Sequence, residues 1–182
     1  MGRVRVLQDA GLVAPVRGEY TIGWTSSLAK NEMTHKTFFQ DASRSTIQEH
    51  LVEAWFVRDF ILHATKRHRT PLIGHSDMDL FGFDLILGLD GSPAFLLVQL
   101  KAYGGRTRSW DVHKALLQKG GQVVVARVDY STEEPAISYH VLTPAGRKRA
   151  LEQAPRKAHP GKCKVSKADL REVKDLMELF GV

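Results

Sequence analysis

The segment Phe95-Leu96-Leu97-Val98-Gln99-Leu100-Lys101-Ala102 constrains the fold more than any other part of the sequence. Side chains alternate along a strand, so in a strand predicted over 94–102 Gln99 and Lys101 project from the same face. The residues before Gln99 are apolar on both faces, which is typical of a central strand covered on both sides. Two polar groups at the end of such a strand are costly unless they are paired or used. The segment therefore indicates a functional site.

A second predicted strand, residues 80–89, precedes this one and contains the apolar run Phe83-Asp84-Leu85-Ile86. Asp90-Gly91 between the two strands is a hairpin turn signal, and Ser92-Pro93 lengthens the loop. If the strands pair through this turn, Asp84 approaches Gln99 and Lys101. A carboxylate, an amide oxygen and an ammonium would then meet at one point.

A long helix is predicted upstream, over residues 46–66, with Ser45 as its N-cap and Gln48 in a capping-box position. Its apolar residues cover a wide arc, which predicts burial on more than one side. These are Leu51, Val52, Ala54, Trp55, Phe56, Phe60, Ile61 and Leu62. Glu49 shares a helix face with Val52, Phe56 and Phe60 at 3.6 residues per turn and is a site candidate. Glu53, one turn later, is the alternative.

The second half of the chain predicts further alternation of helices and strands. We expect a short helix over 110–119, strands over 122–128 and 136–142, and a basic helix from Pro144 to about Gln153. A basic linker over 156–164 would lead to a last helix, capped by Ser166 and Asp169 and carrying apolar residues from Leu170 to Phe180. Residues 1–40 read as an N-terminal arm or hairpin, 41–155 as the core domain and 156–182 as linker and C-terminal helix. This order predicts an α/β layer fold.

The chain resembles the PD-(D/E)xK nuclease superfamily at three places. That superfamily carries a glutamate on its first core helix, an aspartate in an x-Asp-Leu-Ile strand and an acid-x-Lys pair on the next strand. Here these positions correspond to Glu49, Asp84 and the pair Gln99 and Lys101. The resemblance implies a restriction-endonuclease-like αβββαβ core over about residues 43 to 130, with a mixed central sheet flanked by helices. It also implies that a homodimer is to be expected.

The resemblance further implies a metal-dependent nuclease, in which Mg²⁺ or Mn²⁺ is held by Asp84, the Gln99 side-chain oxygen, the Leu100 backbone carbonyl and Glu49, directly or through water. Lys101 would orient the attacking water and stabilise developing charge. Gln99 departs from the usual acidic residue, although Gln-x-Lys is similar to Mrr-like endonucleases. The alternative is a catalytically inactive nucleic-acid-binding or protein-interaction module on the same fold. A third interpretation, a metal-independent enzyme with Lys101 as nucleophile, has no other support.

Each of these residues also has a purely structural interpretation. Lys101 could be a strand-end lysine whose ammonium reaches water. Asp84 could cap a bulge or pair with an arginine, and Gln99 could be a satisfied core amide. The loop containing His75, Asp77 and Asp79 could be a simple turn or a contact at the mouth of the site.

Charge is unevenly distributed along the sequence, whose net charge is +6 with a pI near 9.5. Residues 1–102 contain 11 basic and 11 acidic residues, whereas residues 103–182 contain 15 and 9. A basic half favours a polyanionic partner, and we expect this partner to be nucleic acid, with DNA preferred over RNA as the prediction. The alternative is an ordinary solvated surface. The candidate phosphate contacts are Arg106, Arg108, Lys114, Arg147, Lys148 and Arg149.

The cysteine count and the hydropathy pattern narrow the classes of protein to which the chain can belong. The single cysteine, Cys163, can form no internal disulfide and excludes a Cys-rich zinc site. No apolar run reaches membrane-spanning length, and no long apolar stretch follows the basic N-terminus as in a secretory signal. These patterns predict a cytoplasmic protein without a membrane partner.

Overall fold

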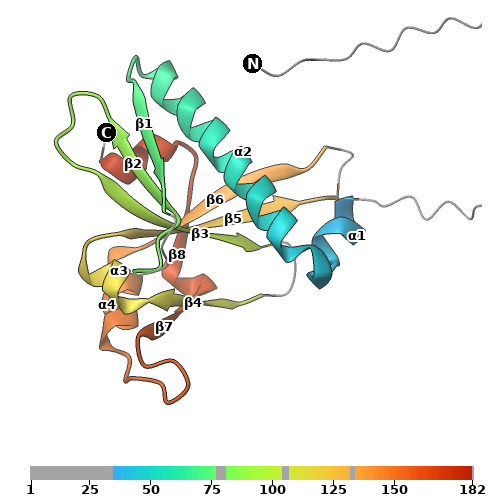
Figure 1. The fold of residues 1–182 in the computed structure, drawn as a ribbon, viewed down its shortest axis with the longest axis vertical. Coiled ribbons are helices and arrows are strands. Elements are labelled where there is room, and N and C mark those ends of the chain that lie inside the picture. Colours follow the sequence, from blue (N-terminus) through green and yellow to red (C-terminus); the bar gives the residue numbers. More distant parts are fainter. Residues whose placement is uncertain (1–34, 77–80, 104–106, 132–133, 182) are drawn as a thin grey trace, which may run out of the picture. The chain divides into compact units, whose positions relative to one another are not determined.

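A mixed six-stranded sheet lies at the centre of the computed structural model, which describes residues 35–76, 81–103, 107–131 and 134–181 (Figure 1). The strand order is β1-β2-β3-β5-β6-β8, and β4 pairs with β7 in a second, two-stranded sheet. β3 and β5 run parallel, whereas all other neighbouring strands are antiparallel. The predicted α/β class with a mixed central sheet is thereby confirmed.

The elements have the following bounds. The strands are β1 (Pro71–His75), β2 (Leu85–Leu89), β3 (Leu96–Tyr103), β4 (Ser109–His113), β5 (Gln122–Asp129), β6 (Ala136–Leu142), β7 (Lys162–Ser166) and β8 (Leu170–Val173). The helices are α1 (His35–Gln40), α2 (Ser45–Lys66), α3 (Lys114–Gln118) and α4 (Pro144–Glu152). Three short 3-10 helices complete them: η1 (Ala42–Arg44), η2 (Lys167–Asp169) and η3 (Leu176–Phe180).

Two hydrophobic cores lie on opposite faces of the central sheet. On one face α2 packs through Val52, Phe56, Phe60 and Ala64, which recur every fourth residue and form one narrow stripe. On the other face, α3, α4, β4 and β7 enclose a second core that includes Leu116, Ala150 and Cys163. The sheet is thus covered on both sides, as the apolar run before Gln99 predicted.

The buried face of α2 is narrower than the sequence predicted. Ile61 and Leu62 are 38% and 57% exposed, so the wide apolar arc is not buried on more than one side. The predicted capping box is also wrong, because Ser45 is the first helical residue and no side chain caps the helix. The Gln48 amide instead donates to the carbonyls of Phe38 and Asp41, at 2.6 and 2.8 Å, and so ties α2 to the segment before it.

The hairpin signal between the two key strands was correct. β2 and β3 pair antiparallel with Leu85 opposite Val98, and Gly91 takes the positive φ of 66° that favours glycine in this turn. The strand predicted over 80–89 begins only at Leu85, and Leu80 lies outside the described residues. β1 was not predicted, because Pro71 and Gly74 read as the end of the helical region rather than as strand residues.

Two predicted helices are corrected by the structure. The helix expected over 110–119 is β4 up to His113, and only Lys114–Gln118 is helical. No C-terminal α-helix follows Ser166: β7 ends at this residue, and the chain continues as the 3-10 helix η2, the strand β8 and the 3-10 helix η3. Ser166 and Asp169 do form a capping box, but it caps the N-terminus of η2, which has only three residues before the chain continues as β8.

The C-terminal segment is part of the central sheet rather than an appendage. β8 pairs with β6, and Val173, Leu176 and Met177 are buried against the core under α2. The division at residue 156 therefore does not separate a linker and helix from the core. Of the N-terminal arm predicted over 1–40, residues 1–34 lie outside the described residues, and His35–Gln40 form α1. Among the described residues, no helix is both long enough and apolar enough to span a membrane.

Candidate metal and phosphodiester site

Asp84 is held by its backbone between two strands. Its N–H donates to the carbonyl of Val98 at 2.8 Å, and its own carbonyl accepts from the N–H of Ser76 at 3.0 Å. Its carboxylate Oδ2 accepts a 2.7 Å hydrogen bond from the backbone N–H of Leu100. The carboxylate that the sequence placed near β3 therefore touches the residue between Gln99 and Lys101.

Gln99 and Lys101 differ in how far they are buried, although both lie on β3. Gln99 is only 4% exposed, and its side-chain Oε1 is buried without a hydrogen-bond partner among the described residues. A buried acceptor without a donor costs about 1–3 kcal/mol, so the interpretation of Gln99 as a satisfied core amide does not hold for this oxygen. Lys101 is half-buried and lines a cavity.

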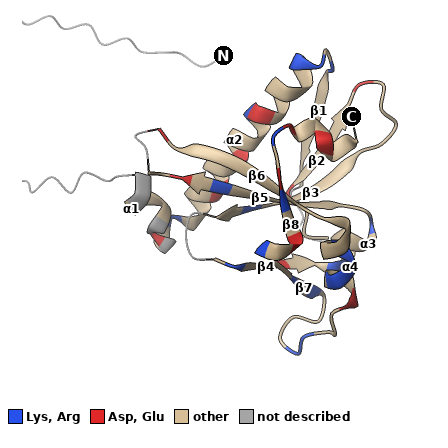
Figure 2. Cartoon of the chain, turned by 180° about the vertical axis from the view of Figure 1, so that it is seen from behind, with Lys and Arg blue, Asp and Glu red and all other residues tan. Residues whose placement is uncertain are grey.

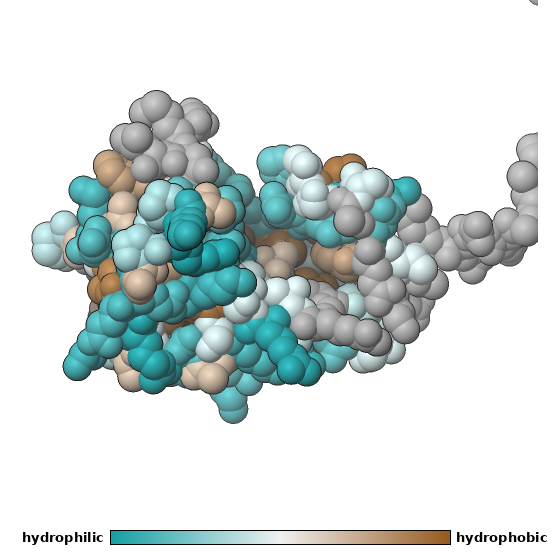
Figure 3. Space-filling view, turned by 90° about the horizontal axis from the view of Figure 1, so that it is seen from below, coloured by the Kyte–Doolittle hydropathy of each residue, from teal (hydrophilic) through white to brown (hydrophobic). Residues whose placement is uncertain are grey.

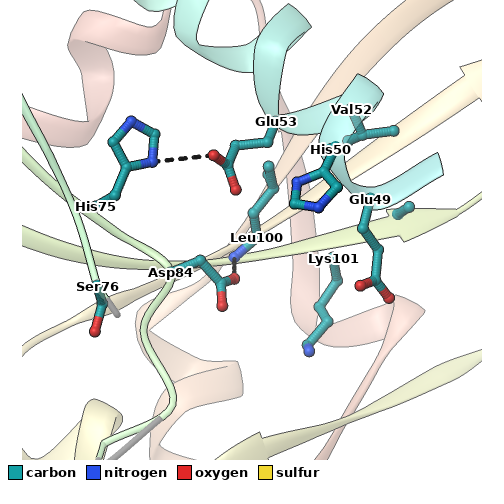
Figure 4. Close-up of a pocket in the computed structure, with 10 residues that line it drawn as sticks. Glu49, His50, Val52, Glu53, His75, Ser76, Asp84, Leu100 and Lys101 are labelled. Atoms are coloured by element: carbon teal, nitrogen blue, oxygen red, sulfur yellow. Dashed lines mark hydrogen bonds and ion pairs between the residues drawn. The ribbon is translucent and has the colours of Figure 1, made fainter. Parts of the chain in front are cut away.

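Two glutamates approach from α2, four residues apart and therefore on one side of the helix. Glu53 is partly buried, and its carboxylate lies 3.0 Å from Nδ1 of His75 in β1. Glu49 is exposed and borders the same cavity. In the close-up, Glu53 extends toward His75 and Asp84, whereas Glu49 extends on the side of Lys101 (Figure 4). Both alternatives for the helix carboxylate thus remain at the site.

These side chains border one cavity of about 350 Å³. Its acidic wall combines α2 with the start of β2, and its basic group comes from β3 (Figure 4). The lining residues are Glu49, His50, Val52, Glu53, His75, Ser76, Asp84, Leu100, Lys101 and Ala102. Gln99 is not among them and lies buried on the same strand. Among the described lining residues, three carboxylates against one ammonium make the cavity favourable for a cation.

The donor set fits a hard divalent cation. At the cavity, Asp84 supplies a carboxylate, Leu100 a backbone carbonyl, and Glu49 or Glu53 a second carboxylate; Gln99, which is buried behind the lining on β3, carries an oxygen without a partner among the described residues. Mg²⁺ keeps several waters and needs only one or two protein carboxylates. Within the described part of the chain, no three His, Cys, Asp or Glu side chains gather closely enough to hold a metal by themselves. An ion here would therefore depend on the amide, the carbonyl and water as well.

Most of the predicted phosphate contacts have other partners. Arg147 donates to the carbonyls of Leu117 and Gly121, at 3.0 and 2.7 Å, and burial lowers the pKa of its guanidinium. The Lys114 ammonium donates to the carbonyls of Leu151 and Gln153 at the end of α4. These two cations hold α3 and α4 together, so the structure assigns them a role in packing.

The other members of that set are more accessible. Arg149 is bound to Asp169 at 2.5 Å, although its side chain is 57% exposed. Lys148 is the most exposed of the three consecutive basic residues, with Glu152 4.0 Å away. Arg108 is exposed, and Arg106 lies outside the described residues. A phosphate contact by Arg108 or Lys148 stays a prediction. Figure 2 shows basic residues on α4 and at the β4 and β7 end of the molecule.

Some lining residues were not singled out from the sequence. His75 was considered for the mouth of the site and does line it, whereas Asp77 and Asp79 lie outside the described residues. His50 was missed, although its position three residues before Glu53 places it near the same side of α2. Ser76 was missed because β1 itself was not predicted. Seen from below, the surface is largely hydrophilic and shows a hollow with a hydrophobic floor (Figure 3).

No protein-family model matches the chain, and no curated protein or solved structure is significantly similar to it. The residues of the site therefore carry the functional inference by themselves.

Proposed function

We propose that the chain is a metal-dependent nuclease of the PD-(D/E)xK type, which hydrolyses phosphodiester bonds of nucleic acid, with DNA as the expected substrate. One observation carries the proposal: the Asp84 carboxylate accepts from the N–H of Leu100, the residue between Lys101 and Gln99, whose side-chain oxygen has no partner among the described residues. Each structural alternative explains one of these residues. A shared site accounts for all three residues together.

The order of elements supports the same fold assignment. α2, β1, β2, β3, α3 and β5 follow one another as helix, three antiparallel strands, helix and a strand parallel to β3. This is the αβββαβ order that the superfamily resemblance implies, with β4 inserted before α3. The core would therefore run from α2 to β5.

The residues would divide the work of hydrolysis as follows. Asp84, the Gln99 side-chain oxygen, the Leu100 carbonyl and a glutamate of α2 would hold Mg²⁺ or Mn²⁺. Such an ion polarises a phosphoryl oxygen and makes bound water more acidic. Lys101 would place its ammonium against a non-bridging phosphate oxygen and stabilise the negative charge that grows as water attacks phosphorus. The hydrogen bond from Leu100 holds the Asp84 carboxylate in place throughout.

Incubation of the full chain with DNA and RNA tests this proposal. Cleavage is expected with Mg²⁺ or Mn²⁺ and should stop when EDTA removes the ion. The competing function is an inactive binding module on the same fold, which the neutral Gln99 favours because it removes one charge from the site. Salt-sensitive binding of nucleic acid without any cleavage would support that alternative. The homodimer implied by the resemblance stays a prediction, which sedimentation analysis of the full chain would measure.

A further inference from the structure

A second, narrower groove lies on a face of the sheet, over the C-terminal parts of β3 and β5 and beside β6. Its lining includes Tyr103 on β3, Trp110 on β4, Arg127 on β5, His140 on β6 and Lys167 on η2. Tyr103 is two residues beyond Lys101 on the same strand, so both side chains lie on the same face. Arg127 stands directly beside Tyr103 in the parallel pairing of β3 and β5. The groove is therefore continuous with the strand that carries the candidate site.

The charge of this groove is positive. Arg127 and Lys167 are exposed, and no Asp or Glu is among the described residues that line it. Neither cation forms an ion pair with a carboxylate of the described residues; Lys167 instead lies 5.9 Å from the centre of the Tyr103 ring. Hydrogen bonds from Ser131 and, to a lesser extent, the charge of Arg127 two residues away hold the pKa of the Asp129 carboxyl below its ordinary value, without an ion pair between the two side chains. These cations differ from Arg147 and Lys114, whose charges are used inside the fold.

A buried donor completes the groove. Trp110 is only 8% exposed, and its indole Nε1 has no acceptor among the described residues. An unsatisfied buried N–H costs about 1–3 kcal/mol. The free volume of the groove is about 10 Å³, which is room for one water-sized group. A single oxygen atom is the acceptor that fits, and the two cations beside it favour an oxygen that carries negative charge.

We propose that this groove binds one phosphate group of the nucleic-acid strand, next to the phosphate that is cleaved. One phosphate oxygen accepts from Trp110 Nε1, while Arg127 and Lys167 neutralise the group from the open side. Two residues of strand separate Lys101 from Tyr103 by about 7 Å, which places the groove beside the site rather than inside it. That the bound phosphate neighbours a cleaved one rests on the proposed nuclease function, but binding in the groove does not require cleavage.

Contacts of this kind position a nucleic acid without reading its sequence, because they address the backbone alone. The proposal therefore predicts similar affinity for oligonucleotides of different sequence. It also adds Arg127 and Lys167 to the phosphate contacts predicted from the sequence, which lie before β4, at the start of α3 and on α4.

The test compares two double variants that lose the same charge. Arg127→Ala with Lys167→Ala empties the groove of its cations, whereas Lys66→Ala with Lys174→Ala removes two exposed cations outside the groove and outside the predicted phosphate contacts. Binding of a fluorescent oligonucleotide is measured by anisotropy in EDTA over a series of salt concentrations. We expect the groove variant to bind about tenfold more weakly and its salt slope to fall by about one. Equal behaviour of the two double variants would overturn the proposal.

Trp110→Phe tests the buried donor separately, since it keeps an aromatic ring and removes only the N–H. Oligonucleotide affinity should fall by a few-fold while thermal stability is kept or raised, because an unsatisfied donor has been removed. Unchanged affinity in a folded Trp110→Phe protein would show that the indole meets only water and would overturn the placement of the phosphate oxygen.

The outcomes also separate this proposal from the nuclease function. If the wild type binds through Arg127 and Lys167 but never cleaves, the groove stands and the nuclease function falls. If the wild type cleaves while the groove variant binds like its control, the nuclease function stands and the groove falls. Absence of any binding to nucleic acid by the wild type in EDTA would overturn the groove as well.

Discussion

The backbone N–H of Leu100 donates a 2.7 Å hydrogen bond to the Asp84 carboxylate across the β2–β3 hairpin. This bond joins the start of β2 to the centre of the Gln99-Leu100-Lys101 segment and fixes the orientation of the carboxylate. Its other oxygen remains directed to the cavity that Lys101 and the glutamates of α2 also line (Figure 4). The hydrogen bond therefore links the fold to the proposed chemistry.

Asp84→Asn should abolish metal binding while keeping the fold. An asparagine carbonyl can still accept from the Leu100 N–H, but it no longer offers an anionic ligand. Calorimetric titration with Mn²⁺ should show no binding, and urea unfolding should show a loss of about 1 kcal/mol or less. Asp84→Ala, which also loses the hydrogen bond, should be the less stable of the two. Unimpaired Mn²⁺ binding by Asp84→Asn would remove Asp84 from the ligand set.

Gln99 offers the sharpest test of the ligand set, because its buried oxygen has no other partner among the described residues. Gln99→Glu should tighten Mg²⁺ binding, since hard cations favour charged oxygen ligands, and Gln99→Ala should weaken it. The rate of cleavage need not follow affinity, because a more neutralised ion is a weaker Lewis acid. Calorimetric titration of Mg²⁺ into both variants and the wild type measures the order of affinities.

A stability measurement controls this comparison. Without metal, Gln99→Glu places a carboxylate where only 4% of the residue is exposed, so the variant should unfold at a lower temperature than the wild type. Added Mg²⁺ should recover more stability in Gln99→Glu than in Gln99→Ala. If both variants respond to Mg²⁺ like the wild type, Gln99 does not touch the ion.

Arg147→Ala should destabilise the protein by about 2–3 kcal/mol, because the charged guanidinium satisfies the carbonyls of Leu117 and Gly121 at the end of α3. Lys148→Ala is the matched control on the same helix. The Lys148 side chain is 78% exposed, so its loss should change the unfolding free energy by about 0.5 kcal/mol at most. Urea unfolding of the two variants measures the difference, and equal values would refute the packing role of Arg147.

Asp169 should make the fold sensitive to acid. Burial alone would raise the pKa of its carboxyl, but hydrogen bonds from the Ser166 side chain and N–H and from Arg149 outweigh burial and hold this pKa below its ordinary 3.8. The ionised form therefore stabilises the native state above pH 3.8, and this stability is lost as the pH falls through the lowered pKa.

Comparison with Asp169→Asn isolates that contribution. The variant should be less stable than the wild type by about 1–2 kcal/mol near neutral pH, and the gap should close in acid. Urea unfolding at several pH values gives both curves. A gap that stays constant through the acid range would mean that the charge of Asp169 contributes nothing.

The sequence predicted the centre of the fold because local signals and long-range pattern agreed there. The apolar run before Gln99 and the Asp90-Gly91 turn together required a buried hairpin, and the structure has one. β1 was not predicted because Pro71 and Gly74 are poor strand formers. They belong to a strand only because they pair with residues of β2, which lie later in the chain. The C-terminal segment was wrongly predicted to be a helix because Leu170 and Val173 are three residues apart, which is a helical spacing. In the structure these two residues are the ends of the strand β8.

The site was predictable in its residue types but not in its surroundings. Same-face spacing brought Gln99 and Lys101 together, and the hairpin brought Asp84 to them. Whether a basic residue faces solvent cannot be read from composition, because Arg147 and Lys148 are neighbours in a basic helix and only Arg147 turns inward. Arg127 and Lys167 drew no notice, since they are far apart in sequence and meet only through the packing of β5 and η2.

The most direct test of the central claim is cleavage of single-stranded and duplex DNA and RNA by the wild type and by Asp84→Asn, with Mg²⁺ or Mn²⁺ and with EDTA. The account predicts cleavage by the wild type only when metal is present and no cleavage by Asp84→Asn under any condition. Equal cleavage by the two proteins, or cleavage by the wild type that persists in EDTA, would contradict it. So would a wild type that leaves every substrate intact with both metals.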